Sequence, residues 1–312
     1  MKVLVYNHIA DHYRRMLNEQ FPELEVAAGK ERPIVDEHIG DAEVLLTWKF
    51  PLAALDKAKK LRWIQLTSAG VDHLRPATDR LRHIVVTNAR GIHADVMADY
   101  AMGTITMLQW NFRQLLREQQ ARQWNHRFTE PLASRTLGVI GLGAIGQEIA
   151  RRGASIGMTV VGTKRTPGSV EGVSRVFGPD HLREMLSLCD FVILVVPQTP
   201  ETDRMIGEAE LRAMQRTAFL VNIARGSVVD EPALIRALQE RWIAGAALDV
   251  FAQEPLPADS PFWEMDTVII TPHVAGEPVN YAGRVMGIFA ENLKRWAEGQ
   301  PLRNVVDLAR GY

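Results

Sequence analysis

Three side chains in the second half of the chain have the types needed to transfer a proton to a carbonyl group. Arg225, Glu254 and His273 each follow a different strand-like segment. An arginine can hold a carboxylate through parallel hydrogen bonds, and a histidine beside a carboxylate can donate a proton near neutral pH. Taken alone, Arg225 is also typical of a surface ion pair, Glu254 of a loop end, and His273 of a structural histidine. Because ligands bind at the carboxyl ends of strands in open α/β sheets, we expect the three to converge and to serve reduction of a small acid's carbonyl.

A glycine-rich turn precedes these residues. The sequence GLGAIG at 141–146 lies between a strand-like segment and a helical pattern. Gly141 permits a tight turn, Gly143 permits close approach of a pyrophosphate, and Gly146 permits close packing of the helix on the strand. An ordinary glycine turn uses the same residues, but the strand before it and the helix after it favour a dinucleotide site at the helix N-terminus.

The segment that normally selects NAD carries no acid here. An NAD site places Asp or Glu about 20 residues after the first glycine, on the ribose 2′-hydroxyl. At that distance the chain reads GTKRTP at 162–167, with two cations and two hydroxyl groups: Thr163, Lys164, Arg165 and Thr166. These groups suit a 2′-phosphate, so the sequence predicts a preference for NADP(H). NAD(H) is the alternative, since a solvated basic turn has the same composition.

The elements that must position these residues form two series of short apolar, β-branched runs separated by helical patterns. The first series is 2–6, 43–47, 63–66 and 84–87, and the second is 137–141, 159–162, 191–196, 218–223, 246–250 and 268–271. Such alternation predicts right-handed βαβ units. We therefore expect an α/β fold with two doubly wound parallel sheets. A long helical stretch at 94–124, apolar nearly all round in its first part, separates the series, and another helix at 281–298 ends at Gly299.

Composition narrows the class of protein. The 312 residues correspond to about two domains. With 36 basic and 37 acidic residues, the formal charge of −1 argues against nucleic acid or an anionic membrane as partner. No apolar run approaches the ~20 residues of a membrane span, and the N-terminus is typical of a first strand rather than a signal peptide. Cys189 is the single cysteine, which argues against disulfides and cysteine-based zinc sites. We expect a cytoplasmic protein without a metal.

Taken together, the motifs resemble those of the D-isomer-specific 2-hydroxyacid dehydrogenase family, and within it the NADPH-dependent glyoxylate/hydroxypyruvate reductases. In family order they are SAGVD at 68–72, GLGAIG at 141–146, VPQTPET at 196–202, NIARGSVVDE at 222–231, LDVFAQEP at 248–255 and TPHVAG at 271–276. They extend along nearly the whole chain. Glu254 argues against the formate dehydrogenase branch, which has glutamine at that position.

The resemblance implies an architecture. A Rossmann cofactor domain at 94–282 would be inserted into a flavodoxin-like substrate domain formed by 1–93 plus 283–312. Catalysis would occur in the cleft, with hinge closure on the substrate. The helical stretch at 94–124 would pack across the two-fold axis of a homodimer, although a buried core helix has the same pattern.

The resemblance also implies residue roles. Arg225 anchors the substrate, His273 donates the proton, and Glu254 raises the pKa of His273 so that it stays protonated near neutral pH. The substrate residues would be Trp48, Lys49, Ser68, Ala69, Gly70 and Val71 with Arg225 and His273, although Trp48 has the alternative of a core position and Lys49 that of a solvated charge. The cofactor residues would be Gly141, Gly143, Ala144, Ile145, Gly146, Thr163, Lys164, Arg165, Thr166, Val196, Pro197, Thr202, Ile223, Ala224, Arg225, Asp249, His273, Ala275 and Gly276.

The expected activity is reduction of a small 2-ketoacid, such as glyoxylate or hydroxypyruvate, to the D-2-hydroxy acid by NADP(H). Two alternatives remain. One is an NAD-dependent D-2-hydroxyacid dehydrogenase, and the other is a dinucleotide-sensing binding protein like the corepressors of the family. The sequence leaves open which 2-ketoacid is used and in which direction the reaction runs.

Overall fold

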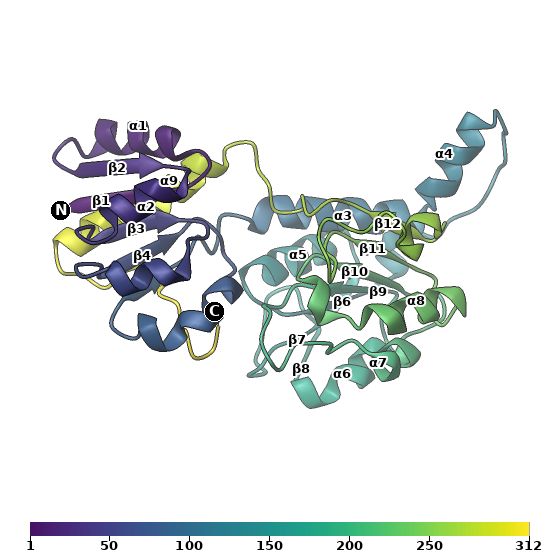
Figure 1. Cartoon of the computed structure of the whole chain (residues 1–312). Coiled ribbons are helices and arrows are strands. Elements are labelled where there is room, and N and C mark those ends of the chain that lie inside the picture. Colours follow the sequence, from purple (N-terminus) through teal and green to yellow (C-terminus); the bar gives the residue numbers. More distant parts are fainter. Residues whose placement is uncertain (312) are drawn as a thin grey trace. The chain divides into compact units, whose positions relative to one another are not determined.

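The computed structural model describes residues 1–311, which form two compact units (Figure 1). Unit 1 comprises Met1–Ile92 and the chain from Pro278 onward, and unit 2 comprises His93–Glu277. The expected domains, 1–93 plus 283–312 and 94–282, change at nearly the same positions. The chain returns to unit 1 at Pro278, just before the C-terminal helix begins at Tyr281. The sequence placed this boundary five residues later, at 283.

Unit 1 is built on a sheet of five parallel strands in the order β2-β1-β3-β4-β5, the flavodoxin-like order. The strands are β1 Lys2–Tyr6, β2 Glu25–Gly29, β3 Val44–Thr47, β4 Trp63–Leu66 and β5 Val85–Thr87. Every residue of β3 and β4 is buried, as expected of central parallel strands covered on both faces. Strand β2 is not among the predicted strands, because it lies at the edge of the sheet and its EVAAG composition has low β propensity.

The helices of unit 1 include one that returns from the C-terminal end of the chain. They are α1 Ala10–Gln20, α2 Arg32–His38 and α9 Tyr281–Ala297, with 3-10 segments η1 Leu52–Lys57 and η2 Asp72–Leu81. Phe289 of α9 packs on Trp63 of β4, with ring centroids 5.2 Å apart. Gly299 adopts φ +67° just beyond α9, which confirms the predicted helix end.

Unit 2 contains seven parallel strands in the order β12-β11-β10-β9-β6-β7-β8. The strands are β6 Thr136–Ile140, β7 Thr159–Thr163, β8 Arg175–Phe177, β9 Phe191–Leu194, β10 Phe219–Asn222, β11 Gly245–Leu248 and β12 Val268–Ile270. Chain order reverses between β6 and β9, which makes the carboxyl ends of these strands the switch point where α/β sheets bind ligands. Strand β8, a three-residue strand at the edge of the sheet that begins with an exposed arginine, is not among the predicted strands.

The helices of unit 2 flank this sheet (Figure 1). They are α3 Ala94–Gln109, α4 Phe112–Gln120, α5 Ala144–Ser155, α6 Leu182–Leu186, α7 Glu208–Ala213 and α8 Glu231–Gln239, with 3-10 segments η3 Leu132–Ser134, η4 Pro179–His181, η5 Gly226–Val228 and η6 Pro261–Glu264. Helix α3 lies against α5, β10 and β11. Its residues Ala98, Ala101 and Ile105 have no exposed surface, in agreement with the expected burial.

The helical stretch expected at 94–124 is not continuous. It breaks at Asn111, whose φ of +50° is left-handed and interrupts the hydrogen-bond ladder. The Asn111 side chain then accepts a hydrogen bond from the Gln114 N–H and starts α4 as a new helix. Helix α4 and the segment after it project from the rest of unit 2 (Figure 1). Arg113 secures the base of α4 by donating to the carbonyl oxygens of Met265 and Val268.

Within residues 1–311, the helices are too short or too polar to span a bilayer. Over the same residues, no group of three or more His, Cys, Asp or Glu side chains has an arrangement that would hold a metal ion.

Candidate active site

The glycine turn of unit 2 has the geometry of a phosphate-binding loop. Gly141 follows β6 with φ +106°, a conformation that side chains rarely adopt. A Cβ on Gly146 would lie 2.1 Å from the Gly141 carbonyl oxygen, so α5 approaches the turn as closely as glycine allows. A Cβ on Gly143 would meet nothing within 4 Å, which leaves room above the N-terminus of α5. The turn, with Ala144 and Ile145 in the first turn of α5, fits a dinucleotide pyrophosphate.

The basic segment after β7 lies directly beside this turn. The Leu142 N–H donates to the Thr163 carbonyl oxygen at 3.0 Å, so the start of the segment is joined to the glycine turn. The Thr163 residue is buried, while Lys164, Arg165 and Thr166 are exposed. Two cations and a hydroxyl group therefore stand exposed beside the glycine turn.

The loop after β9 lies against the turn, and the loop after β10 follows the next strand of the sheet. A Cβ on Gly141 would lie 2.8 Å from the Val195 carbonyl oxygen and 2.9 Å from Cγ1 of Val196, so the loop after β9 touches the turn. Within that loop the Thr202 hydroxyl donates to the Pro197 carbonyl oxygen at 2.7 Å. Ile223 and Ala224, which follow β10, are buried.

Two of the predicted catalytic side chains are in direct contact. Nδ1 of His273, after β12, lies 2.8 Å from Oε2 of Glu254, after β11. Since a carboxylate accepts, the ring donates from Nδ1, and Nε2 is the nitrogen left for a substrate. The His273 side chain is 48% exposed and that of Glu254 37% exposed, so the pair is open to ligands. This contact is the arrangement expected of an acid catalyst with a supporting carboxylate.

Asp249 holds the backbone that carries His273. His273 has φ +55°, a strained conformation for a residue with a side chain. Its N–H donates to the carbonyl oxygens of Asp249 and Thr271, at 2.9 and 3.1 Å. The buried Asp249 carboxylate also accepts from the Thr271 hydroxyl at 2.6 Å and from the N–H groups of Val274 and Ala275 at 2.9 and 3.0 Å. These bonds offset the strain and fix the direction of the imidazole.

A tyrosine that the sequence analysis did not identify extends this network. The Tyr100 hydroxyl of α3 lies 2.7 Å from Oγ1 of Thr271. Because Thr271 gives its single hydroxyl hydrogen to Asp249, Tyr100 is the donor. Burial raises the pKa of Tyr100 to about 12, so it remains a donor at neutral pH. A tyrosine in an apolar helix is the only sequence signal, and it does not reveal a partner 171 residues away.

The third catalytic candidate is brought to the same sheet edge by backbone packing. A Cβ on Gly226 would lie 1.9 Å from the carbonyl carbon of Phe251, so the loop after β10 rests on the loop that leads to Glu254. The buried Asn222 side chain holds the turn, because it donates to the Arg225 carbonyl oxygen at 3.1 Å and accepts from the Ala224 N–H at 3.0 Å. Nη1 of Arg225 donates to the Ala224 carbonyl oxygen at 2.7 Å.

The predicted substrate residues of unit 1 follow β3 and β4. Ser68, Ala69 and Gly70 are partly exposed, while Val71 is buried. Trp48 is 49% exposed, so its alternative as a core residue is wrong. Nζ of Lys49 lies 4.8 Å from the centroid of the Trp48 ring, a cation–π distance.

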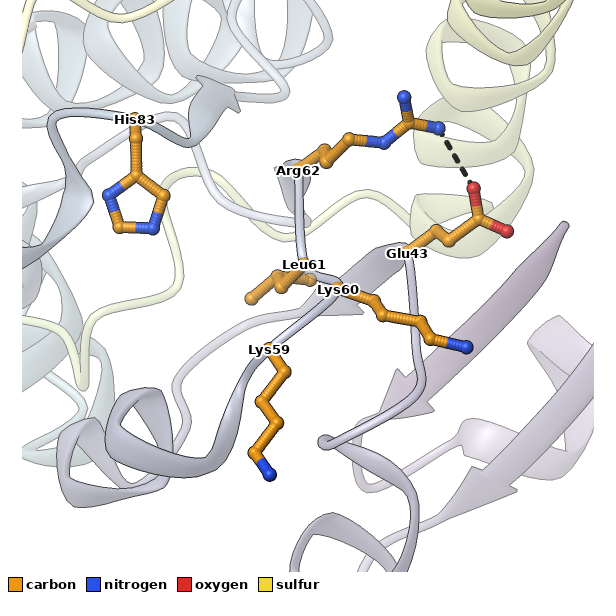
Figure 2. Close-up of a pocket in the computed structure, with 6 residues that line it drawn as sticks. All are labelled: Glu43, Lys59, Lys60, Leu61, Arg62 and His83. Carbon is orange, nitrogen blue, oxygen red and sulfur yellow. Dashed lines mark hydrogen bonds and ion pairs between the residues drawn. The ribbon is translucent and has the colours of Figure 1, made fainter.

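A surface hollow of about 340 Å³ lies at the amino ends of β3 and β4, away from the carboxyl ends that carry Trp48 and Ser68 (Figure 2). Glu43 and Arg62 immediately precede β3 and β4, and their side chains, which line the hollow, form an ion pair at 2.8 Å. Ligand sites of α/β sheets lie at the carboxyl ends, where Ser68 and Lys49 are found. The hollow is therefore separate from the candidate substrate residues.

Comparisons with known proteins agree with these arrangements. Residues 102–275 match the family described as "D-isomer specific 2-hydroxyacid dehydrogenase, NAD binding domain". The chain is 33% identical to the glyoxylate reductase of Korarchaeum cryptofilum over 323 residues, which cover 98% of this chain and 96% of that protein. It is 35% identical to the D-3-phosphoglycerate dehydrogenase of Methanocaldococcus jannaschii over 99% of its own residues, but spans only 60% of the length of that relative.

Solved structures with the same fold cover the entire chain. A D-isomer-specific 2-hydroxyacid dehydrogenase from Xanthobacter autotrophicus Py2, in complex with NADPH and MES, has a TM-score of 0.88 at 31% identity, covering 100% of this chain and 99% of that one. An NADPH-dependent glyoxylate/hydroxypyruvate reductase from Sinorhizobium meliloti, in complex with NADP and sulfate, has a TM-score of 0.89 at 26% identity, with the same coverage.

Proposed function

Because the chain belongs to the D-isomer-specific 2-hydroxyacid dehydrogenase family, we propose that it reduces a small 2-ketoacid to the D-2-hydroxy acid with a nicotinamide dinucleotide. The observation that carries the proposal is the contact between His273 and Glu254 at the sheet edge that also holds the glycine turn. The glyoxylate reductase relatives support a small substrate. The cytoplasmic location expected from the sequence stays a prediction.

In this proposal different side chains donate the proton, stabilise the proton donor and hold the substrate. When bound, the reduced nicotinamide supplies a hydride to the 2-keto carbon. His273 donates a proton from Nε2 to the carbonyl oxygen, while Glu254 accepts a hydrogen bond from Nδ1 and stabilises the charged ring. Arg225 holds the substrate carboxylate, and the backbone N–H groups of Ser68–Val71 bind its oxygens. In this proposal unit 1 contributes backbone donors to substrate binding, and unit 2 contributes Arg225, cofactor binding and acid catalysis.

We further propose that NADPH is preferred over NADH. In the wild-type protein, loss of absorbance at 340 nm with glyoxylate, hydroxypyruvate and pyruvate should be faster with NADPH. Replacing Lys164 and Arg165 together by alanine should raise the KM for NADPH about 10- to 100-fold and leave that for NADH unchanged, because hydrogen bonds to a charged phosphate contribute about 1.5–3 kcal/mol.

The matched control for that variant is Lys59→Ala with Lys60→Ala. It removes two neighbouring cations from the unit 1 hollow (Figure 2) and changes the net charge equally. A wild-type preference for NADH would leave the reductase but overturn the 2′-phosphate assignment. No turnover with either cofactor, despite dinucleotide binding, would favour the corepressor-like alternative.

We propose that the protein is a homodimer formed through α3, α4 and the segment after α4. Large apolar side chains are exposed there, with Trp124 98% and Phe128 94% exposed. Soluble monomers rarely expose a large apolar surface, and Trp110 at the end of α3 and Phe112 and Leu116 of α4 are exposed as well.

Light scattering after gel filtration should therefore give twice the chain mass of 35.0 kDa. Trp124→Ser combined with Phe128→Ser should shift the population toward monomer at low micromolar concentration, because the apolar area that drives association is lost. Val279→Ser removes a fully exposed apolar side chain from unit 1 and should leave the mass unchanged. A monomeric wild-type protein would refute the dimer.

A further inference from the structure

We infer that Tyr281 and Asn88 are positioning residues for substrate, which act by holding the carbonyl groups of the loop after β4 so that its N–H groups stay available to a carboxylate. The inference rests on the proposed function and extends it to two side chains that have no assigned role. Tyr281 begins α9, more than 200 residues from the loop, and Asn88 directly follows β5.

Four consecutive carbonyl groups of this loop accept hydrogen bonds from within unit 1. The Tyr281 hydroxyl donates to the Thr67 oxygen at 2.7 Å, and the Ala89 N–H donates to the Ser68 oxygen at 2.9 Å. Nδ2 of Asn88 donates to the Ala69 oxygen at 2.7 Å. The Ser68 hydroxyl donates to the Gly70 oxygen at 2.9 Å. The carbonyl side of the loop is thus fully occupied.

The N–H side is not occupied. Within residues 1–311, the N–H groups of Ser68, Ala69, Gly70 and Val71 donate to no protein acceptor. In a trans peptide the N–H points opposite to the carbonyl oxygen of the preceding residue. Each N–H is therefore directed away from the group that holds the carbonyl before it. Consecutive backbone N–H groups that have no protein acceptor can bind an anion such as a carboxylate.

Both side chains are themselves held in place. Asn88 is 3% exposed, and its Oδ1 accepts from the Arg90 N–H at 3.2 Å. Its backbone exchanges hydrogen bonds with Asn304, a residue of the C-terminal tail. Tyr281 packs against the apolar cluster that contains Tyr13 and Phe289. The C-terminal part of unit 1 therefore sets the direction of the loop peptides.

The test uses the full-length protein and two variants that each remove one donor. Tyr281→Phe deletes the bond to Thr67, and Asn88→Asp deletes the bond to Ala69 while keeping the acceptor for Arg90. We expect each to raise the KM for the best 2-ketoacid about three- to tenfold, with kcat and the KM for NADPH within about twofold of wild type, as for the loss of one hydrogen bond. Tyr13→Phe is the control, since it removes a buried hydroxyl from the same cluster without a bond to the loop.

A second readout does not depend on activity. The amides of Thr67 and Ala89 donate to Thr47 and Ser68, so hydrogen exchange at these two amides reports whether the loop is held. Faster exchange in both variants together with a raised KM supports the inference. An unchanged KM, with or without faster exchange, overturns it. If the wild-type protein reduces no 2-ketoacid, the proposed function fails, and exchange alone then decides whether the two residues hold the loop.

Discussion

Replacing His273 by asparagine is expected to lower the rate of 2-ketoacid reduction about 10²- to 10⁴-fold, the usual contribution of a positioned proton donor. Asparagine can still form a hydrogen bond near Glu254, but its amide cannot replace the Nε2 proton that histidine gives to the substrate. NADPH binding, measured by fluorescence titration, should change little because the glycine turn and the basic segment are untouched.

The chain provides a matched control for this substitution. Nδ1 of His181, in η4, lies 3.3 Å from Oε2 of Glu184, so His181→Asn disrupts another histidine–glutamate pair of unit 2. It is expected to leave the reduction rate unchanged. A His273→Asn enzyme within about tenfold of wild type would show that another group donates the proton.

Gly226→Ala should reduce kcat/KM at least about 10²-fold, although alanine is the smallest possible side chain. Its Cβ would lie 1.9 Å from the Phe251 carbonyl carbon and 2.1 Å from the Phe251 oxygen, and backbone cannot move aside as a flexible side chain can. The loops that carry Arg225 and Glu254 must therefore separate, and a shift of about 1 Å in a catalytic group costs about 10²-fold in rate. We also expect the free energy of unfolding to fall by about 1–3 kcal/mol, as in other overpacked sites.

Steady-state kinetics and thermal unfolding of the purified variant test this prediction. Gly287→Ala is the control, because a Cβ at Gly287 in α9 meets nothing within 4 Å. It should leave activity unchanged and raise stability slightly, as alanine favours helix more than glycine does. A soluble Gly226→Ala enzyme with wild-type kcat/KM would contradict the close packing of the two loops.

Much of the fold could be predicted because parallel strands buried on both faces are short apolar runs. Segments such as Lys2–Tyr6 and Trp63–Leu66 begin and end where the sequence indicated. The failures have local causes. Strand β2 is rich in alanine and pairs with β1 along five residues, a tertiary contact that its own composition does not indicate. The break at Asn111 depends on a single left-handed residue, which helical periodicity does not detect.

The chemistry of the candidate site could be predicted from residue types alone, because these fix which groups can hold phosphate, accept a proton or donate one. The sequence also indicated the order along the chain of the strands that Arg225, Glu254 and His273 follow. The folded chain was needed to show that Glu254 reaches His273. It also shows that Tyr100 and Asp249 hold the strained backbone of His273, and that Tyr281 holds the loop after β4. Those contacts join residues far apart in the chain, and hydrogen bonds form at distances near 3 Å that strand order alone does not specify.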